Sequence, residues 1–557
     1  VHMPRQFRTL GRRILWISTL AVLLGSGVAV AAYALTGLIG LISNLAFYGR
    51  WDFSLSSPAD NQLGLWVILV PAVGGIIVGI MARYGSGAIR GHGIPEAMEQ
   101  VLLNESRIKP RLTWLKPVSS AVAIGSGGPF GAEGPIIATG GALGSLAVEL
   151  LLFERRARSL IPVALAAVAG TALRYVLEGN EPMFPMPTVA APGFPAIGTY
   201  VVLGLILGVV SVAITRLTYA IEDGFAKLPI HWMWWPALGG LVVGCVGYVM
   251  PMTLGVGYGN ITAVISGQLG LGAMLALCLL KLLSWSVALG SGTSGGTLAP
   301  LFTIGGALGG ALGIALAHAA PWLGVDPRMA ALVCMAAIFA GASRAFLTSV
   351  VFAFETTHQV HGLLPLLGAC AAAYLVSGLM MRNTIMTEKI ARRGVRVPSD
   401  YSADYLDQIR VGDACSRQVV SLRDSQKLSE VRAWLGSKTS AYTHQGFPVL
   451  GEDGQLRGVL TRRNLLDADI ADDERIGRLI IRPIIGIRED HSLREAADHM
   501  VEANVGRLVV LDRDDPTRMV GILTRGDLLA AHVQRLREAR HASRHLRRRR
   551  KAEAAPI

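Results

Sequence analysis

The sequence predicts an α-helical polytopic membrane protein followed by a smaller cytoplasmic α/β part, and three observations lead to this fold class. First, 52% of the 557 residues are hydrophobic and only 16% are charged, whereas soluble domains usually carry about 25% charged residues. Second, most charges lie near the N-terminus and after Ile390, while residues 14–380 are largely apolar. Third, short β-like runs begin to alternate with helical ones near residue 408.

The apolar part contains two kinds of segment. Five runs are long enough to span a bilayer, at residues 14–47, 63–82, 197–217, 232–251 and 363–380. The segments 85–103, 124–146, 288–317 and 328–358 are also apolar, but most are interrupted by clustered glycine and proline. Lipid cannot satisfy the backbone groups that such interruptions expose, so these segments must pack in protein or line a wet cavity. Broken helices at membrane depth are typical of transport sites.

Basic residues flank the apolar spans on both sides. They are Arg5, Arg8, Arg12 and Arg13 before the first span and Arg392, Arg393 and Arg396 after the last one. The positive-inside rule therefore predicts two cytoplasmic termini, and we expect a cell inner membrane. The net charge of +13 does not indicate nucleic acid, because the basic residues do not interleave with aromatic ones on a polar face. The basic run at 547–551 is interpreted as a solvated tail or a contact with anionic lipid.

Enzyme chemistry has no support in the sequence. The five cysteines are scattered without the spacing of a zinc site or a disulfide framework, so no metal site is expected. There is no Walker-type phosphate loop and no recognisable Ser/His/Asp motif. We therefore expect neither catalysis nor a required cofactor.

Three glycine-rich turns share one form, in which glycines precede a proline and a helix-forming run. They are Gly91–Pro95, Gly131–Pro135 and Gly295–Pro300. Proline suits the first turn of a helix, and glycine lets the preceding backbone turn tightly. A helix N-terminus carries roughly half a positive charge, so three of them aimed at one point form an anion site without a full cation. The alternative is that these residues are packing glycines and helix caps.

These turns resemble, in the same order, the motifs GSGIP, G(K/R)EGP and GxFxP of the CLC chloride channel and transporter family. Ser343–Thr348 with Glu355 resembles the family's S-R-A-P-L-T…E stretch. The resemblance covers about residues 10–390 and implies an inverted-repeat membrane domain of the CLC type. It also implies a homodimer in a lipid bilayer, in which each subunit has its own path for chloride or a similar small anion.

The resemblance assigns roles to particular residues. Glu133 matches the glutamate that blocks the outer side of the anion path and moves away when it is protonated. Backbone amides at Thr297 and Leu298 would supply central donors, and Leu298 stands where phenylalanine is common. The full set of anion-site candidates is His92, Gly93, Ile94, Gly131, Ala132, Gly134, Thr297, Leu298 and Ile385.

Three departures from the family bear on the transport mode. His92 replaces the coordinating serine, and its ring either donates to an anion or packs against the loop. Ile385 lies where the family has its inner tyrosine, which predicts a more open inner gate. Leu150, beside Glu149, stands where exchangers carry a proton-relaying glutamate. Glu133 permits both modes, while Leu150 and Ile385 favour a channel-like or weakly proton-coupled protein, with a strict chloride/proton antiporter as the alternative.

The sequence is also short after Leu146. The family continues there through another broken helix, so roughly one span of ~20 residues or more is missing. Such a gap would remove part of the first inverted repeat. The gap is either a real deletion or a stretch missing from the sequence in hand. Together with His92 and Ala132 it supports a third hypothesis, a non-conducting membrane-anchored sensor.

The residues after 408 contain an internal duplication of β-α-β-β-α order. Runs at 419–422, 446–450 and 458–460 with a helix at 427–437 are repeated as 484–487, 507–511 and 521–523 with a helix at 493–505. This arrangement resembles a tandem pair of CBS domains. The predicted organisation is an N-terminal segment 1–13, a membrane domain 14–390, a linker 391–407, CBS domains 408–468 and 469–535, and a tail 536–557.

Each copy ends in a sequence that resembles the ribose-binding signature of CBS domains. The first copy has Thr461 and Asn464, and the second has Thr524 and Asp527. Asp527 would bind ribose hydroxyls while Thr524 approaches a phosphate, so an adenine nucleotide is expected, if anywhere, in the second copy. The alternative is a helix cap at Thr524 without a ligand.

Overall fold

The computed structural model describes residues 12–103, 108–150, 160–394, 406, 409–437, 444–513, 515, 518–531 and 533. The described residues up to 394 belong to one compact unit, which we call the membrane unit. Those from 406 onward belong to a second compact unit, the CBS unit.

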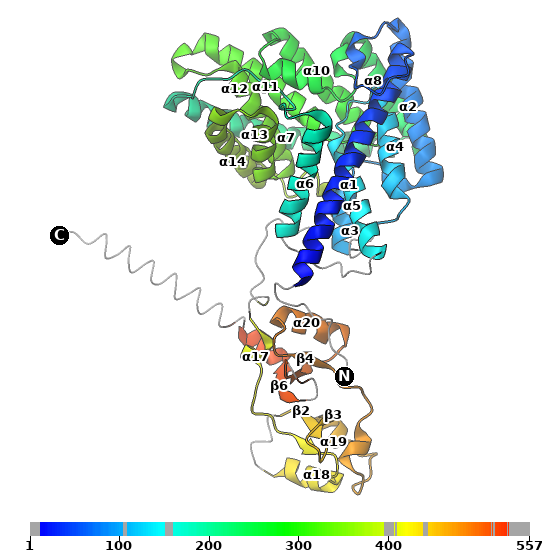
Figure 1. Ribbon diagram of the computed structural model, residues 1–557, viewed down its shortest axis with the longest axis vertical. Coiled ribbons are helices and arrows are strands. Elements are labelled where there is room, and N and C mark those ends of the chain that lie inside the picture. The colour runs from blue at the N-terminus through cyan, green and yellow to red at the C-terminus, as the bar shows by residue number, and fades with distance from the viewer. Residues whose placement is uncertain are drawn as a thin grey trace, which may run out of the picture. The chain divides into compact units, whose positions relative to one another are not determined.

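The described residues of the membrane unit form helices joined by loops (Figure 1). Its α-helices are α1 (Arg12–Ser43), α2 (Leu69–Ile80), α3 (Ile94–Leu103), α4 (Leu112–Gly125), α5 (Glu133–Leu150), α6 (Leu160–Glu178), α7 (Phe194–Ala226), α8 (Trp235–Val249), α9 (Tyr258–Ile265), α10 (Leu271–Gly290), α11 (Leu298–Ala319), α12 (Pro327–Ser343), α13 (Phe346–Thr357), α14 (Leu363–Met380) and α15 (Glu388–Arg392).

Eight helices in the described part of the chain are long and apolar enough to cross a bilayer. All five runs predicted from the sequence are among them. The other three are Ile161–Glu178, Leu271–Gly290 and Leu298–Ala319. The sequence did not count the last one as a span because the segment 288–317 looks interrupted. The interruption is present at residues 291–297, before the helix begins, and α11 itself is continuous. α11 is continuous because Gly305 and Gly309 are packing positions, where an added Cβ would clash with α12.

The two halves of the membrane unit are related by an internal repeat. α2 and α8 share the pattern Pro-Ala-x-Gly-Gly, at Pro71–Gly75 and Pro236–Gly240. Their contacts are reciprocal, because a Cβ on Gly75 would clash with the Pro236 carbonyl and one on Gly240 would clash with the Pro71 carbonyl. Glycine therefore lets the two backbones touch. Reciprocal contacts of this kind indicate an approximate twofold axis between the halves.

Two buried lysines extend the repeat to α4 and α10. The Lys116 ammonium donates to the carbonyls of Ile89 and Gly91, each at 2.7 Å. The Lys281 ammonium donates in the same way to Thr253 at 2.9 Å and Gly255 at 3.0 Å. A buried charge is costly unless it is hydrogen-bonded, so these carbonyls stabilise the lysines. Each lysine in return fixes the turn that leads into a short helix, α3 in one half and α9 in the other.

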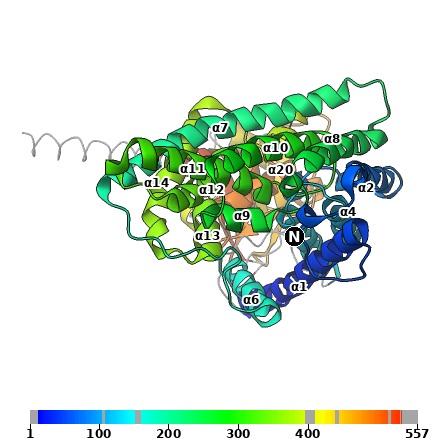
Figure 2. The ribbon, with the colours of Figure 1, turned by 90° about the horizontal axis from the view of Figure 1, so that it is seen from above.

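The halves differ after their glycine-rich helices. α5 and α11 share the sequence Gly-Gly-Ala-Leu-Gly, at 140–144 and 305–309. α12 and α13 follow α11 before the chain reaches α14, which packs on α7. In the first half only residues 151–159, which lie outside the described part, separate α5 from α6, which packs on α1 (Figures 1 and 2). Within the described residues the first half thus has no counterpart of α12 and α13. The sequence predicted a gap of about one span, whereas the comparison of the halves gives two helices.

The CBS unit contains two equivalent three-stranded sheets. Their strands are β1 (Leu422–Arg423), β2 (Gly446–Leu450) and β3 (Leu456–Thr461), followed by β4 (Gly486–Arg488), β5 (Arg507–Leu511) and β6 (Met519–Thr524). In each sheet the first pair of strands is parallel and the second pair is antiparallel, with a register shift near the end of the middle strand. The predicted strand at 419–422 is reduced to the short β1. The helices of the CBS unit include α17 (Val411–Ala414), α18 (Leu428–Gly436), α19 (Arg462–Leu465) and α20 (Leu493–Glu502).

Candidate functional site

The three glycine-rich turns meet in the membrane unit. Gly131 and Gly296 form an isolated bridge, in which the Gly296 N–H donates to the Gly131 carbonyl at 2.8 Å and the Gly131 N–H donates back at 3.2 Å. The first turn joins through Gly91, whose N–H donates to the Thr293 carbonyl at 3.3 Å. The sequence-predicted turns are therefore one structural feature, although they are far apart along the chain.

Glycine is required where the turns touch. Gly91 and Gly93 have φ angles of +91° and +87°, which other residues rarely adopt. A Cβ on Gly93 would lie 2.9 Å from the Gly134 carbonyl oxygen, and one on Gly134 would lie 3.1 Å from the Gly296 Cα. These glycines are therefore packing residues, as the alternative interpretation of the turns expected. A packing role is compatible with an anion site, because close packing is what brings the turns together.

Three helices begin at this meeting point. α3 starts at Ile94, α5 at Glu133 and α11 at Leu298. Ala132 and Thr297 each lie one residue before a helix start and are buried. Each helix start adds partial positive charge, so the arrangement can hold an anion without a cationic side chain. Thr297 also has a buried hydroxyl with no partner among the described residues.

Glu133 lies where these three helix N-termini meet. Its Oε1 accepts a hydrogen bond of 2.8 Å from the Tyr258 hydroxyl, while its Oε2 is buried without a described partner. Tyr258 was not singled out from the sequence. The spacing of Gly255 and Gly257 before α9 matches that of Gly91 and Gly93 before α3, and all four have positive φ angles, but this pattern marks the turn and not its contact with Glu133.

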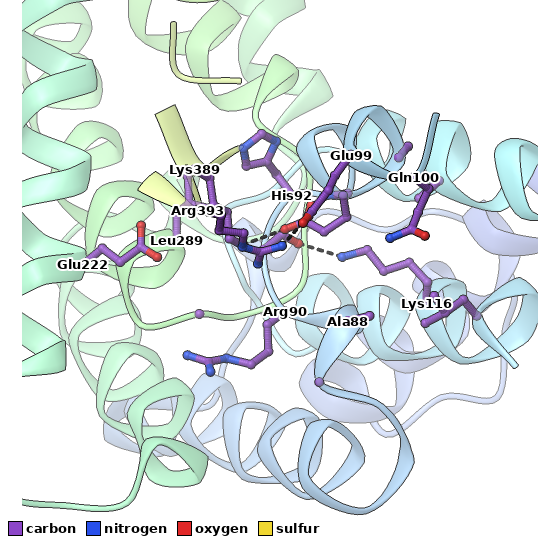
Figure 3. Close-up of a pocket in the computed structure, with 18 of the residues that line it drawn as sticks. Ala88, Arg90, His92, Glu99, Gln100, Lys116, Glu222, Leu289, Lys389 and Arg393 are labelled. Carbon is purple, nitrogen blue, oxygen red and sulfur yellow. Dashed lines mark hydrogen bonds and ion pairs between the residues drawn. The ribbon is translucent and has the colours of Figure 1, made fainter. Parts of the chain in front are cut away.

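A cavity of 310 Å³ adjoins the first turn (Figure 3). His92, Gly93 and Ile385 line it together with Tyr219 from α7. The His92 ring lies against the Ile385 backbone, and its buried Nδ1 has no described partner. The Tyr219 hydroxyl donates to the Ile385 carbonyl at 2.8 Å. The sequence has Ile385 in place of the family's inner tyrosine, so no phenol was expected here. The phenol of Tyr219 is nevertheless present, and it comes from α7.

The cavity wall carries both signs of charge. Lys389 of α15 pairs with Glu96 of α3 at 2.6 Å, and Arg393 pairs with Glu99. Arg90 lies over the Trp232 ring, with its guanidinium carbon 4.7 Å from the ring centroid. Figure 3 shows Arg90, Glu99, Lys389 and Arg393 among the side chains around the cavity. The pairs connect α3, which begins at the first turn, to the last helix of the membrane unit.

The proposed proton-relay position cannot be compared with the rest of the site. Glu149 and Leu150 end α5, and their side chains lie outside the described residues. The interpretation of Leu150 therefore stays a prediction.

The two candidate nucleotide positions of the CBS unit have the same local geometry. Asp527 Oδ2 accepts from the Thr524 N–H at 2.7 Å and from the Thr524 hydroxyl at 2.8 Å. Asn464 Oδ1 accepts from the Thr461 N–H at 3.0 Å, and the two residues form a capping box at α19. The helix-cap alternative therefore describes these side chains as they stand. Both contacts with Thr524 use the same carboxylate oxygen of Asp527, Oδ2.

Family models match most of the chain. The model for the voltage gated chloride channel family matches residues 73–155 and 146–378, and the CBS domain model matches 411–471 and 476–533. The two channel-family matches overlap at 146–155, where the sequence indicates missing residues. Together they cover more than half of the chain.

Individual proteins agree with these matches. Chloride channel protein CLC-f of Arabidopsis thaliana is 26% identical over 83% of this chain, which spans only 62% of that protein. The H(+)/Cl(−) exchange transporter ClcA of Vibrio cholerae is 26% identical over 64% of this chain and 89% of its own length.

Solved structures show the same fold. A slow cyanobacterial Cl−/H+ antiporter superposes with a TM-score of 0.60 and 19% identity, over 68% of this chain and 97% of that one. A eukaryotic CLC transporter has a TM-score of 0.55 and 17% identity, over 92% of this chain and 98% of that one. The converging turns, the internal repeat and the family matches agree, and the chain belongs to the voltage gated chloride channel (CLC) family, with a C-terminal pair of CBS domains.

Proposed function

We propose that this protein transports chloride or a similar small anion across a membrane, with one path in each subunit of a homodimer. The observation that carries the proposal is the position of Glu133 at the meeting point of three helix starts. A carboxylate there imitates an anion, and its protonation removes the attraction that keeps it in place. Glu133 would therefore act as the gate.

The preferred mode is channel-like or weakly proton-coupled transport. Ile385 offers no side-chain hydroxyl at the inner end of the path, and the Tyr219 hydroxyl there already bonds to the Ile385 carbonyl. Leu150 would not relay protons. The alternative is a strict chloride/proton antiporter, which the names of the ClcA relatives and of the cyanobacterial structure favour.

The membrane setting and the regulation are part of the same proposal. The basic residues at both ends of the membrane domain favour cytoplasmic termini in a cell inner membrane. The CBS unit would bind an adenine nucleotide in its second copy, at Thr524 and Asp527, and modulate transport. No nucleic acid partner is expected.

The test is anion efflux from liposomes that contain the purified protein, with chloride and external pH recorded together. We expect chloride efflux with little proton movement, and a Glu133→Gln variant that conducts with a flatter pH dependence because its gate is permanently neutral. Stoichiometric proton uptake that disappears in Glu133→Gln would instead establish an antiporter. No flux of chloride, nitrate or fluoride in the parent would contradict transport.

A second candidate function is a membrane-anchored sensor in which the CBS unit binds a nucleotide and the membrane unit does not conduct. The absence of α12 and α13 counterparts among the described residues of the first half favours it. Sequencing the gene discriminates between the two. A longer reading frame that encodes two more helices between α5 and α6 would remove the support for the sensor.

A further inference from the structure

We propose that Tyr258 is a positioning residue that holds the Glu133 carboxylate in its closed position and thereby sets the pH at which the path opens. The proposal rests on the proposed gating function of Glu133 and adds a second residue, from the other half of the molecule, to that gate.

The contact is direct and is the only side-chain hydrogen bond that the described residues give to Glu133. The Tyr258 hydroxyl lies 2.8 Å from Glu133 Oε1, and Oε2 is buried with no described partner. A hydroxyl that donates to a charged carboxylate forms a stronger bond than one that donates to a neutral group. The bond therefore stabilises the charged, closed state more than the protonated one.

The Tyr258 ring is held from the side. The Phe184 ring meets it edge-on, with centroids 5.7 Å apart and an interplanar angle of 62°. Phe184 is itself fixed, because its N–H donates to the Thr356 carbonyl of α13 at 2.9 Å. Aromatic pairs of this geometry prefer a defined arrangement, so the hydroxyl has little freedom to turn away.

The backbone that carries Tyr258 is fixed as well. Tyr258 is the first residue of α9 and follows Gly257, whose φ is +79°. The preceding turn is fixed by Lys281, which donates to the carbonyls of Thr253 and Gly255. The hydroxyl is therefore presented by a rigid element, as expected of a positioning group.

Few other titratable groups face this pair. Among the described residues, Glu178 at the end of α6 acts electrostatically on Tyr258. Lys281 lies beside Gly257, and its ammonium donates to the carbonyls of Thr253 and Gly255. Gly131 lies directly against the Glu133 carboxylate, and neither Gly131 nor its neighbour Ala299 carries a titratable side chain. The Tyr258 hydroxyl oxygen also interacts with the Ala132 backbone, which does not titrate, so the pH-dependent part of a change at Tyr258 should be felt mainly by Glu133.

The experiment is Tyr258→Phe in the full protein, with chloride efflux from liposomes measured between pH 4.5 and 8.5. The variant keeps the ring and its contact with Phe184 but loses the donor. We expect the pH of half-maximal flux to rise by about one unit, since the loss of one charge-assisted hydrogen bond corresponds to about a tenfold change in the protonation equilibrium. At neutral pH the flux should rise severalfold.

The matched control is Tyr200→Phe. The Tyr200 hydroxyl is also partly buried and hydrogen-bonded, but it accepts from the Asp326 N–H at 3.1 Å. This variant should lose stability without moving the pH profile. An equal shift in both variants would overturn the proposal, because it would show a general effect of a lost hydroxyl.

The double variant Tyr258→Phe with Glu133→Gln tests the route of the effect. If Tyr258 acts through Glu133, the Phe substitution adds no pH shift once the carboxylate is gone. A shift that persists in the double variant contradicts the proposal.

Infrared difference spectra of the parent against Glu133→Gln separate this proposal from the proposed function. The Glu133 carboxylate band should disappear at a higher pH in Tyr258→Phe than in the parent, whether or not the protein transports anions. An unchanged midpoint overturns the role of Tyr258, while absent flux alone overturns only the gating function.

Discussion

The two halves of the membrane unit use one sequence pattern in two surroundings. In the second half, Gly309 lies against α12, and an added Cβ would be 2.6 Å from the Ala330 carbonyl oxygen. The equivalent Gly144 in the first half has no described atom within 4 Å of that position. The glycine pattern therefore specifies close helix packing, but among the residues that the structure describes only the second half contains the helix that packs there.

The site scaffold is nevertheless present in both halves. Each half has a buried lysine that binds two carbonyls, two glycines with positive φ and a short helix that begins directly after them. These contacts lie within the segment from α2 to α5 and its mate from α8 to α11. The comparison teaches that the turns of the site and the surrounding helix packing are separable parts of the fold.

The largest expected effect concerns the lysines, where the halves should behave alike. Lys116→Met and Lys281→Met each leave two buried carbonyls unpaired, which should cost about 3 kcal/mol of stability. Thermal unfolding of the purified protein in detergent should show similar, large decreases in Tm for both. The exposed Lys227→Met serves as the control and should be near neutral. A large loss in only one half would contradict an equivalent scaffold.

Substitution of the equivalent glycines should change stability differently in the two halves. Gly309→Ala forces a methyl group into contact with α12 and should destabilise the protein by about 2 kcal/mol, a typical overpacking cost. Gly144→Ala should be neutral or stabilise by up to about 1 kcal/mol, because alanine is the better helix former. The measurement is again Tm in detergent. Equal destabilisation by both substitutions would mean that a helix does pack on α5.

The sequence predicted the site better than the packing around it. The glycine-proline turns were recognised because their chemistry is local, and the structure brings all three together. Two features were missed for different reasons. α11 is continuous although its glycines look like breaks, and Tyr258 reaches Glu133 across the repeat, where no local pattern reports the contact. Tertiary contacts of this kind are not encoded in the spacing of one segment.

The CBS unit offers a second, smaller comparison between repeated parts. In the first copy, Gln426 Oε1 accepts from the Arg423 N–H at 2.9 Å. In the second copy, His491 Nδ1 accepts from the Arg488 N–H at 3.3 Å. The two side chains have the same role, because each accepts a hydrogen bond from the backbone N–H three residues earlier. Only the histidine nitrogen stops accepting when it takes up a proton.

The smallest expected effect follows from this difference. Burial lowers the pKa of His491 below its usual value of about 6.5, and Arg488 and His499 act in the same direction, against Glu495 and Asp490. The folded state therefore binds fewer protons than the unfolded state when the pH falls below 6.5. Stability is retained above that pH and decreases as the pH drops towards the lowered pKa, by less than about 1 kcal/mol.

Hydrogen exchange of the full protein, corrected for the intrinsic pH dependence, measures this effect in β4 and β5. The parent should lose protection in these strands between pH 7 and 5.5, while His491→Gln should not, because glutamine keeps the acceptor without titrating. The reverse exchange, Gln426→His, should transfer the pH dependence to β1 and β2. These results would show that the acid sensitivity of the second copy comes from His491. Equal pH dependence of protection in the parent and in His491→Gln would instead locate that sensitivity elsewhere in the CBS unit.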